Sequence, residues 1–183
     1  MKGLSFAFAI LLPIALLGCG EKQAARMPPP HRMTEEAIGH YCGMNVLEHP
    51  GPKGQILVAS LIEPVWFSSV RDTIAFTVLP DEPKDIQAIY VSDMGKAGSW
   101  DKPGADNWVE ARKALFVIGS RIKGGMGSEE VVPFSDRSAA ETFVNENGGR
   151  IVSFADVPKT YVLGPDEEGG GASPGQKDRA SLD

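Results

Sequence analysis

The stretch Phe67-Ser-Ser-Val-Arg-Asp-Thr-Ile-Ala-Phe-Thr-Val-Leu-Pro80 decides the fold, because it is compatible with either a strand or a helix. Its β-branched residues favour a strand. Apolar residues, however, recur at helical spacing from Val70 to Val78. Ser69 stands three residues before Asp72, as in a capping box, and Pro80 would stop a helix.

A second stretch repeats this order and favours the helix. Phe67 and Phe134 are each followed by a serine and, nine residues later, by another phenylalanine, Phe76 and Phe143. The match is weak in identity but agrees in order, as expected for an internal duplication. We therefore predict a helix after each of these two serines, with Ser135 or Ser138 as the cap of the second.

Three strands are predicted around each helix, from apolar and β-branched runs bounded by turn residues. They cover 41–47, 56–62 and 86–91 in the first unit, and 108–118, 130–134 and 150–154 in the second. The resulting prediction is an α+β fold of two β-β-α-β units, 36–100 and 101–163, that share a sheet or a packed core. Residues 164–183 are acidic and glycine-rich, which predicts a disordered tail.

The N-terminal residues indicate export and lipid attachment. Residues 1–18 have a positive start and an apolar run that is short for a membrane span, so they read as a signal peptide. The run ends in Leu16-Leu17-Gly18-Cys19, which resembles a bacterial lipobox with Cys19 as the acylated residue. Gly20 rather than Asp follows Cys19, which by likeness to Gram-negative lipoproteins favours the outer membrane. Residues 19–35 are polar and proline-rich, and we expect them to be a solvated tether that includes His31 and Met33.

Composition excludes several classes of function. The net charge is −6 and no basic stripe is present, which argues against nucleic-acid binding. We find no zinc-protease, P-loop, nucleophile-elbow or dinucleotide-binding motif, and three histidines offer few general bases. The sequence therefore gives no sign of an enzyme.

Cysteine usage indicates a lone thiol that could pair with another chain, react, or bind a metal. The chain has two cysteines, and a lipidated Cys19 would leave Cys42 as a lone thiol in an exported protein. Met44 follows two residues later, and in an extended chain these two side chains would share a side. Thiolate and thioether ligands suit Cu(I) better than hard cations. The alternative is that Cys42 and Met44 simply fill core space.

Two further residues are candidate ligands. Met126 is a large apolar side chain in the otherwise small loop Gly124-Gly125-Met126-Gly127, where packing alone gives little reason for it. His40 precedes Cys42 by two residues and would supply an imidazole on the same side. Each residue has a simpler interpretation. Met126 could be a loop methionine packed at the domain edge, and His40 could be a partly exposed histidine without a ligand role.

Taken together, these residues resemble the nitrous oxide reductase accessory lipoprotein family. The resemblance rests on the lipobox, Tyr41-Cys42-Gly43-Met44, the Met126 loop and the second helix, and it covers most of 36–157. It implies a periplasm-facing copper chaperone that binds Cu(I) through Cys42, Met44 and Met126, with His40 as a further ligand. It also implies delivery to the copper clusters of nitrous oxide reductase, a membrane ABC-type maturation complex as partner, and a fold like the organomercurial lyase core.

Three alternatives remain at this point. The protein could be a metal-free scaffold of an envelope complex. It could be a thiol enzyme of the organomercurial-lyase type, although a second active thiol is missing from the mature chain. Cys19 and Cys42 could form a disulfide, which a lipidated Cys19 would prevent.

Overall fold

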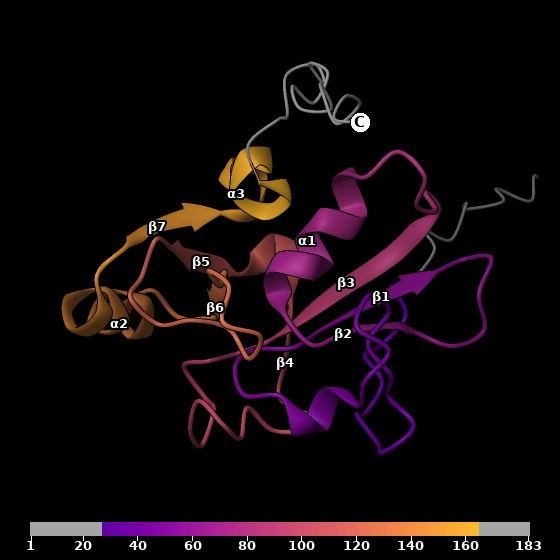
Figure 1. Ribbon diagram of the computed structural model, residues 1–183, viewed down its shortest axis with the longest axis horizontal. Coiled ribbons are helices and arrows are strands. Elements are labelled where there is room, and N and C mark those ends of the chain that lie inside the picture. Colours follow the sequence, from indigo (N-terminus) through magenta and orange to yellow (C-terminus); the bar gives the residue numbers. More distant parts are fainter. Residues whose placement is uncertain (1–26, 165–183) are drawn as a thin grey trace, which may run out of the picture.

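The computed structural model describes residues 27–164 and contains two antiparallel sheets (Figure 1). The strands are β1 (Gly54–Val58), β2 (Val65–Phe67), β3 (Ile86–Ser92), β4 (Trp108–Glu110), β5 (Leu115–Ile118), β6 (Val132–Phe134) and β7 (Arg150–Ser153). The helices are α1 (Val70–Val78), α2 (Arg137–Asn147) and α3 (Lys159–Leu163), with 3₁₀ turns η1 (Val46–Glu48), η2 (Ala111–Lys113) and η3 (Phe154–Asp156). The predicted α+β class is therefore confirmed.

The two sheets are built in the same way. The first has the strand order β2-β1-β3-β4 and the second β6-β5-β7, so in each sheet the first strand of a β-β-α-β run lies between the other two. β4 is an addition to the first sheet and pairs with β3, although it comes after residue 100. The division of the chain at 100/101 stays a prediction.

One core joins the two halves. The largest buried cluster combines Phe67 and Phe76 of the first half with Phe116 and Val152 of the second. α1 packs against β1 and β2 on one side and against α3 on the other, whereas α2 covers the second sheet away from this core (Figure 1). No helix within residues 27–164 has the length and apolar character needed to cross a bilayer.

Both predicted helices form, and local capping explains their starts. The Ser69 hydroxyl accepts from the amide of Asp72 at 3.0 Å, as the capping-box spacing predicted. The second helix is capped instead by Asp136, whose carboxylate accepts from the amide of Ala139, so the prediction of Ser135 or Ser138 is wrong. A carboxylate satisfies the free amides of the first turn as well as a hydroxyl does.

Two strand predictions need correction. Residues 41–47 do not form a strand but a tight turn followed by η1. The predicted strand 108–118 is two strands of different sheets, β4 and β5, separated by η2 at the residues with the least strand-like composition. The break lets one continuous segment pass from the first sheet to the second.

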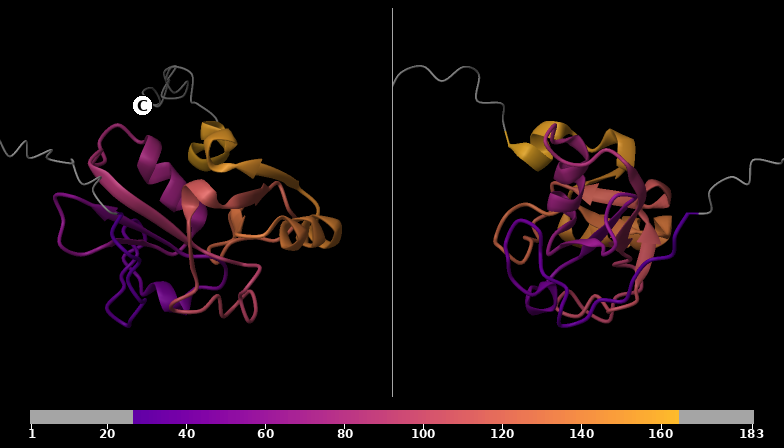
Figure 2. Two further views of the ribbon diagram at one scale, coloured as in Figure 1. Left: turned by 180° about the vertical axis from the view of Figure 1, so that it is seen from behind. Right: turned by 90° about the vertical axis from the view of Figure 1, so that its right-hand side faces the viewer.

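The segment before the first sheet is docked rather than solvated. Met33 is 2% exposed and its amide donates to the carbonyl of Ala105, so its predicted exposure is wrong. The backbone of His31 exchanges two hydrogen bonds, each 2.8 Å, with the buried side chain of Gln55. In all three orientations this indigo segment lies at the opposite end of the molecule from α3 (Figures 1 and 2).

Candidate metal-binding site

The turn Gly39–Asn45, called the Cys42 turn below, is closed by its own backbone. The amide of Gly39 donates to the carbonyl of Met44 and that of Gly43 to the carbonyl of Gly39, both at 2.8 Å. Gly43 has φ +66°, a conformation that side chains disfavour. The turn is attached to β2 through the amide of His40, which donates to the carbonyl of Trp66. The position of Cys42 is therefore set before any ion arrives.

The Cys42 thiol is free, half-buried and pointed back into its own turn. Its sulfur lies 3.9 Å from the carbonyl oxygens of Gly39 and Met44, and 3.5 Å from the hydroxyl of Ser68. A Cβ at Gly39 would lie 2.5 Å from this sulfur, so only glycine leaves room for it. The oxygen contacts are long and weak, and none would compete strongly with a soft cation for the thiolate.

Met44 lies in the same turn as Cys42, although the chain here is not extended as predicted. Because 41–47 is not a strand, the argument that residues i and i+2 share a side does not apply to Cys42 and Met44, or to His40. Met44 is 41% exposed at the surface next to the half-buried thiol. The structure thus brings the two sulfur-bearing residues together through a turn, with the thioether on the solvent side.

Met126 lies at the tip of a short hairpin that packs against the residues just after η1. The amide of Gly124 donates to the carbonyl of Ser128, and that of Gly127 to the carbonyl of Gly124. Met126 is 57% exposed, whereas its neighbour Gly125 fits tightly against His49 and Pro50, just after η1. The Met126 loop, residues 124–128, therefore rests on the segment that continues from the Cys42 turn.

Two buried charged side chains connect these regions. The ammonium of Lys53, a residue 1% exposed, donates to the carbonyls of Pro50, Gly51 and Ser68. It thereby ties the residues under the Met126 loop to Ser68, which contacts Cys42. Burial lowers the pKa of Lys53 to about 8, and the negative charge of Glu130 works against this shift.

Glu130 lies at the base of the Met126 loop. Its carboxylate accepts from the amides of Arg71 and Val131, and it leaves no space for a side chain at Gly124. Burial raises the pKa of Glu130 to about 7, although both amides favour the charged form. The charge of Glu130 therefore changes near neutral pH.

The two histidines near the site differ in their surroundings. His40 Nε2 lies 3.3 Å from a carboxylate oxygen of Glu82, which also accepts from the Tyr41 hydroxyl at 2.8 Å. Burial and this carboxylate raise the pKa of Tyr41 well above its usual range. His49 Nε2 is buried and has no hydrogen-bond partner among residues 27–164, and its ring lines a cavity of about 200 Å³ together with Lys53.

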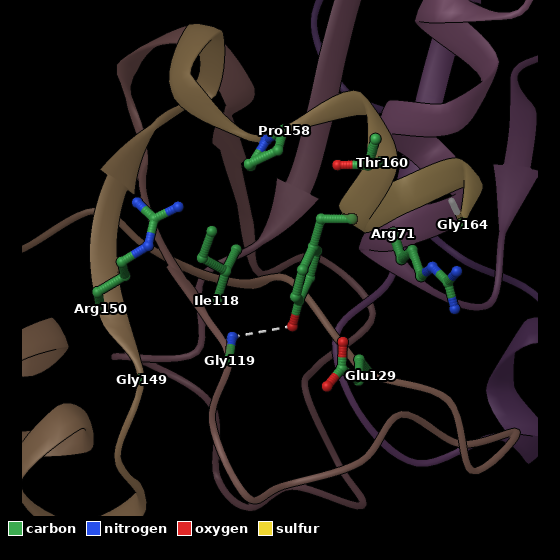
Figure 3. Close-up of a pocket in the computed structure, with 10 residues that line it drawn as sticks. Arg71, Ile118, Gly119, Glu129, Gly149, Arg150, Pro158, Thr160 and Gly164 are labelled. Carbon is green, nitrogen blue, oxygen red and sulfur yellow. Dashed lines mark hydrogen bonds between the residues drawn. The ribbon is translucent and has the colours of Figure 1, made fainter. Parts of the chain in front are cut away.

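The described residues offer little support for a metal site elsewhere in the molecule. Within the described part of the chain, no three His, Cys, Asp or Glu side chains gather as a metal cluster. A cavity of about 650 Å³ lies beside α3 (Figure 3), where the hydroxyl of Tyr161 accepts from the amide of Gly119 at 2.9 Å. No histidine, cysteine or methionine lines this cavity, so it offers no ligand for a soft ion.

Four residues around the site were not predicted from the sequence: Lys53, Ser68, Glu82 and Glu130. Each of them has at least one partner 15 to 59 residues away along the chain, as in Lys53 with Ser68 and Arg71 with Glu130. The one local signal is a lysine inside a cluster of prolines and glycines, whose free carbonyls such a side chain can satisfy.

Comparison with known proteins identifies the family. The NosL family profile matches residues 30–162. The chain is 48% identical over 157 residues to the copper-binding lipoprotein NosL of Achromobacter cycloclastes, covering 85% of this chain and 81% of that protein. It is 30% identical over 161 residues to the copper-binding lipoprotein NosL of Stutzerimonas stutzeri, covering 87% and 83%.

A solved structure agrees in fold as well. The crystal structure of the copper chaperone NosL from Shewanella denitrificans superposes with a TM-score of 0.66 at 33% identity, over 71% of this chain and 97% of that one. The extent of the profile match, the identities and the shared fold all give the same answer, and the chain belongs to the NosL family.

Proposed function

We propose that this protein is a membrane-anchored copper chaperone that holds Cu(I) through Cys42 and releases it to a partner. The observation that carries the proposal is the free, half-buried Cys42 thiol in a preformed turn that also carries the exposed Met44. Its relatives are named copper-binding lipoproteins and a copper chaperone, which supports cargo binding rather than catalysis.

The donor set favours the monovalent ion. Sulfur donors select Cu(I), whereas a site for Cu(II) is usually built from nitrogen and oxygen in a tetragonal arrangement. Cys42, Met44 and Met126 would be the sulfur ligands, and the exposure of both methionines lets them reorient toward an ion bound at the thiol. An open, low-coordinate site also leaves a position from which a recipient can take the ion.

His40 is our proposed nitrogen ligand. A histidine that binds a metal through one ring nitrogen commonly has the other held by a carboxylate, and Glu82 is placed to do this at Nε2. Nδ1 would then face the ion. His49 is a weaker candidate, because two lysines, Lys53 and Lys102, line its cavity with a single carboxylate, Asp101, and this balance disfavours a cation.

Location and partners complete the proposal. The lipobox Cys19 and the signal 1–18 lie outside the described residues, as does the tail 165–183, and the names of the relatives support lipid attachment. Each buried methylene contributes about 0.8 kcal/mol, so two or more acyl chains would hold the protein at a membrane, with the outer membrane proposed from Gly20. The proposed recipients on the periplasmic side are a membrane ABC-type maturation complex and, through it, the copper clusters of nitrous oxide reductase.

The repeated architecture supports a duplication origin. Both sheets use the same β-β-α-β order, and Phe67 and Phe134 end the equivalent strands β2 and β6. We propose that the two units arose from one ancestor, as the resemblance to the organomercurial lyase core implies.

Anaerobic titration with Cu(I) in competition with a chromogenic chelator tests the proposal. The wild-type protein should bind one equivalent, and Cys42→Ser should lose at least about a hundredfold in affinity, since the thiolate is the one anionic donor. Met27→Leu, at an exposed methionine away from the turn, is the matched control and should bind normally.

Unchanged binding by Cys42→Ser would refute the copper site proposed here. If that variant also matured nitrous oxide reductase in cells as well as the wild type does, the metal-free scaffold would become the better interpretation.

A further inference from the structure

Exposed apolar side chains gather around the Cys42 turn. Among the described residues, the large hydrophobic side chains that are exposed include a group between residues 38 and 62, which we call the apolar face: Ile38, Tyr41, Met44, Leu47, Leu61 and Ile62. Ile62 is 95% exposed, an arrangement that costs free energy in water unless something covers it. Concentrations of this kind commonly mark interaction sites.

The apolar face is continuous across two segments of the chain. One shallow hollow of about 550 Å³ is lined by Ile38, just before the Cys42 turn, by His40 within it, and by Leu61 and Ile62 of the loop between β1 and β2. Hydrogen bonds fix both of its sides. The amide of His40 donates to the carbonyl of Trp66, and the amide of Ser60 donates to the carboxylate of Asp85 at 2.8 Å.

Every exposed charge on this part of the chain is negative. Between Arg32 and Arg71 the charged residues are Lys53, which is buried, and four exposed glutamates, Glu35, Glu36, Glu48 and Glu63. The basic residues that flank this stretch in the sequence each have a partner elsewhere, an ion pair for Arg32 and a backbone carbonyl for the other two. Arg32 pairs with Asp106, Arg71 Nε donates to the carbonyl of Val162, and Lys84 donates to the carbonyl of Leu79.

We propose that the apolar face is the docking surface for the protein that receives copper, and that the recipient presents an apolar patch ringed by lysine and arginine. The inference rests on the proposed function, because the face surrounds the thiol from which the ion would leave. Acidic residues around an apolar centre favour a basic protein partner, since opposite charges speed the encounter and apolar contact holds the complex. They disfavour an anionic bilayer, which attracts basic surfaces.

Copper transfer to the purified ABC-type maturation complex, held in detergent, tests the docking surface. Ile62→Asp should slow transfer about tenfold while chelator-measured Cu(I) affinity stays unchanged, because the side chain is exposed and is not a ligand. Glu63→Lys should slow transfer at low salt and weaken its salt dependence, since one attractive charge is reversed. Leu163→Asp, at an exposed leucine on α3, is the matched control and should transfer normally.

The outcomes separate this inference from the proposed function. Loss of Cu(I) binding by the wild type would refute the function itself. Normal binding with normal transfer by Ile62→Asp, or equal slowing by Leu163→Asp, would refute the docking surface alone. Flotation of the unlipidated protein with phosphatidylethanolamine–phosphatidylglycerol vesicles, abolished by Ile62→Asp, would assign the face to the membrane. A concentration-dependent dimer abolished by the same substitution would assign it to a second copy. Either result overturns the proposal.

Discussion

The Cys42 turn and the Met126 loop both carry sulfur, but they are held in different ways. The turn is closed by two internal backbone bonds and attached to β2, and it places a half-buried thiol with no space to spare at Gly39. The loop is a short glycine-rich hairpin whose methionine is 57% exposed, while only its base packs tightly.

This difference suggests that the Cys42 thiolate and the Met126 thioether have different roles in copper binding. A rigid thiolate provides a fixed anionic anchor, and a mobile thioether can approach or leave the ion without disturbing it. A carrier needs both properties, because it must bind its cargo and then give it up. The comparison predicts that changes in the turn affect binding more strongly than changes in the loop.

Gly39→Ala should have the largest effect. The added Cβ would lie 2.5 Å from the Cys42 sulfur and force the thiol out of its place. Overpacking of this kind costs about 1–3 kcal/mol, and we expect Cu(I) affinity to fall about a hundredfold as well. Urea unfolding and chelator competition measure the two effects.

Gly43→Ala is the control for a backbone change in the same turn. It meets no atom within 4 Å but must adopt φ +66°, which costs about 1–2 kcal/mol. If Gly43→Ala lowered copper affinity more than Gly39→Ala, space for the sulfur would not be the deciding factor in the turn.

Glu130→Gln tests the buried carboxylate at the base of the Met126 loop. A folded-state pKa of about 7, above the ordinary 4.5, means that the favourable contribution of Glu130 is complete below pH 4.5 and lost as pH rises through 7. Glutamine keeps an oxygen for the amides of Arg71 and Val131. We therefore expect the variant to be about 2 kcal/mol more stable than wild type at pH 8, with the gap closing toward pH 4.5.

Urea unfolding at several pH values measures this gap, with the exposed Glu129→Gln as control. A constant difference across the pH range would mean that Glu130 does not titrate as its burial requires. The buried Lys53 should add a rise in wild-type stability above pH 8, because its lowered pKa makes the charged form costly in the folded state.

The repeating elements could be predicted because they follow local rules. α1 and α2 are amphipathic stretches between clear start and stop signals. The short strand β2, which ends at Phe67, is not among the predicted strands, because three residues carry too little pattern. The free thiol at Cys42 could be predicted from the cysteine count together with the lipobox at Cys19. These features need no knowledge of distant contacts.

The geometry of the site could not be predicted, because it depends on contacts between segments far apart in the sequence. The stretch 41–47 looks extended, but Gly39 and Gly43 close it into a turn, and the sequence pattern does not distinguish these two outcomes. The burial of Lys53 depends on a carbonyl at Ser68, and the position of the Met126 loop depends on His49 and Pro50.

Met126→Leu should weaken copper binding without changing stability. Leucine keeps most of the apolar volume and loses the thioether, and the side chain is more than half exposed. We expect Cu(I) affinity to fall about tenfold, less than for Gly39→Ala, with an unchanged urea midpoint. Met27→Leu serves again as control. X-ray absorption should show one fewer sulfur neighbour, and an unchanged sulfur count would remove Met126 from the ligand set.

The smallest expected effect distinguishes the two histidines. If Glu82 holds His40 Nε2 so that Nδ1 meets the ion, both His40→Ala and Glu82→Gln should lower Cu(I) affinity, by about fivefold and about twofold. His49→Ala should leave affinity unchanged, because the cavity that His49 lines holds two lysines and only one carboxylate, which disfavours a cation. If only His49→Ala lowered Cu(I) affinity, the nitrogen ligand would be His49, which lies against the Met126 loop, rather than His40 in the Cys42 turn. The ligands would then come from the Cys42 turn and the segment around His49. The roles assigned to Cys42 as a fixed ligand and to Met126 as a mobile one would have to be revised.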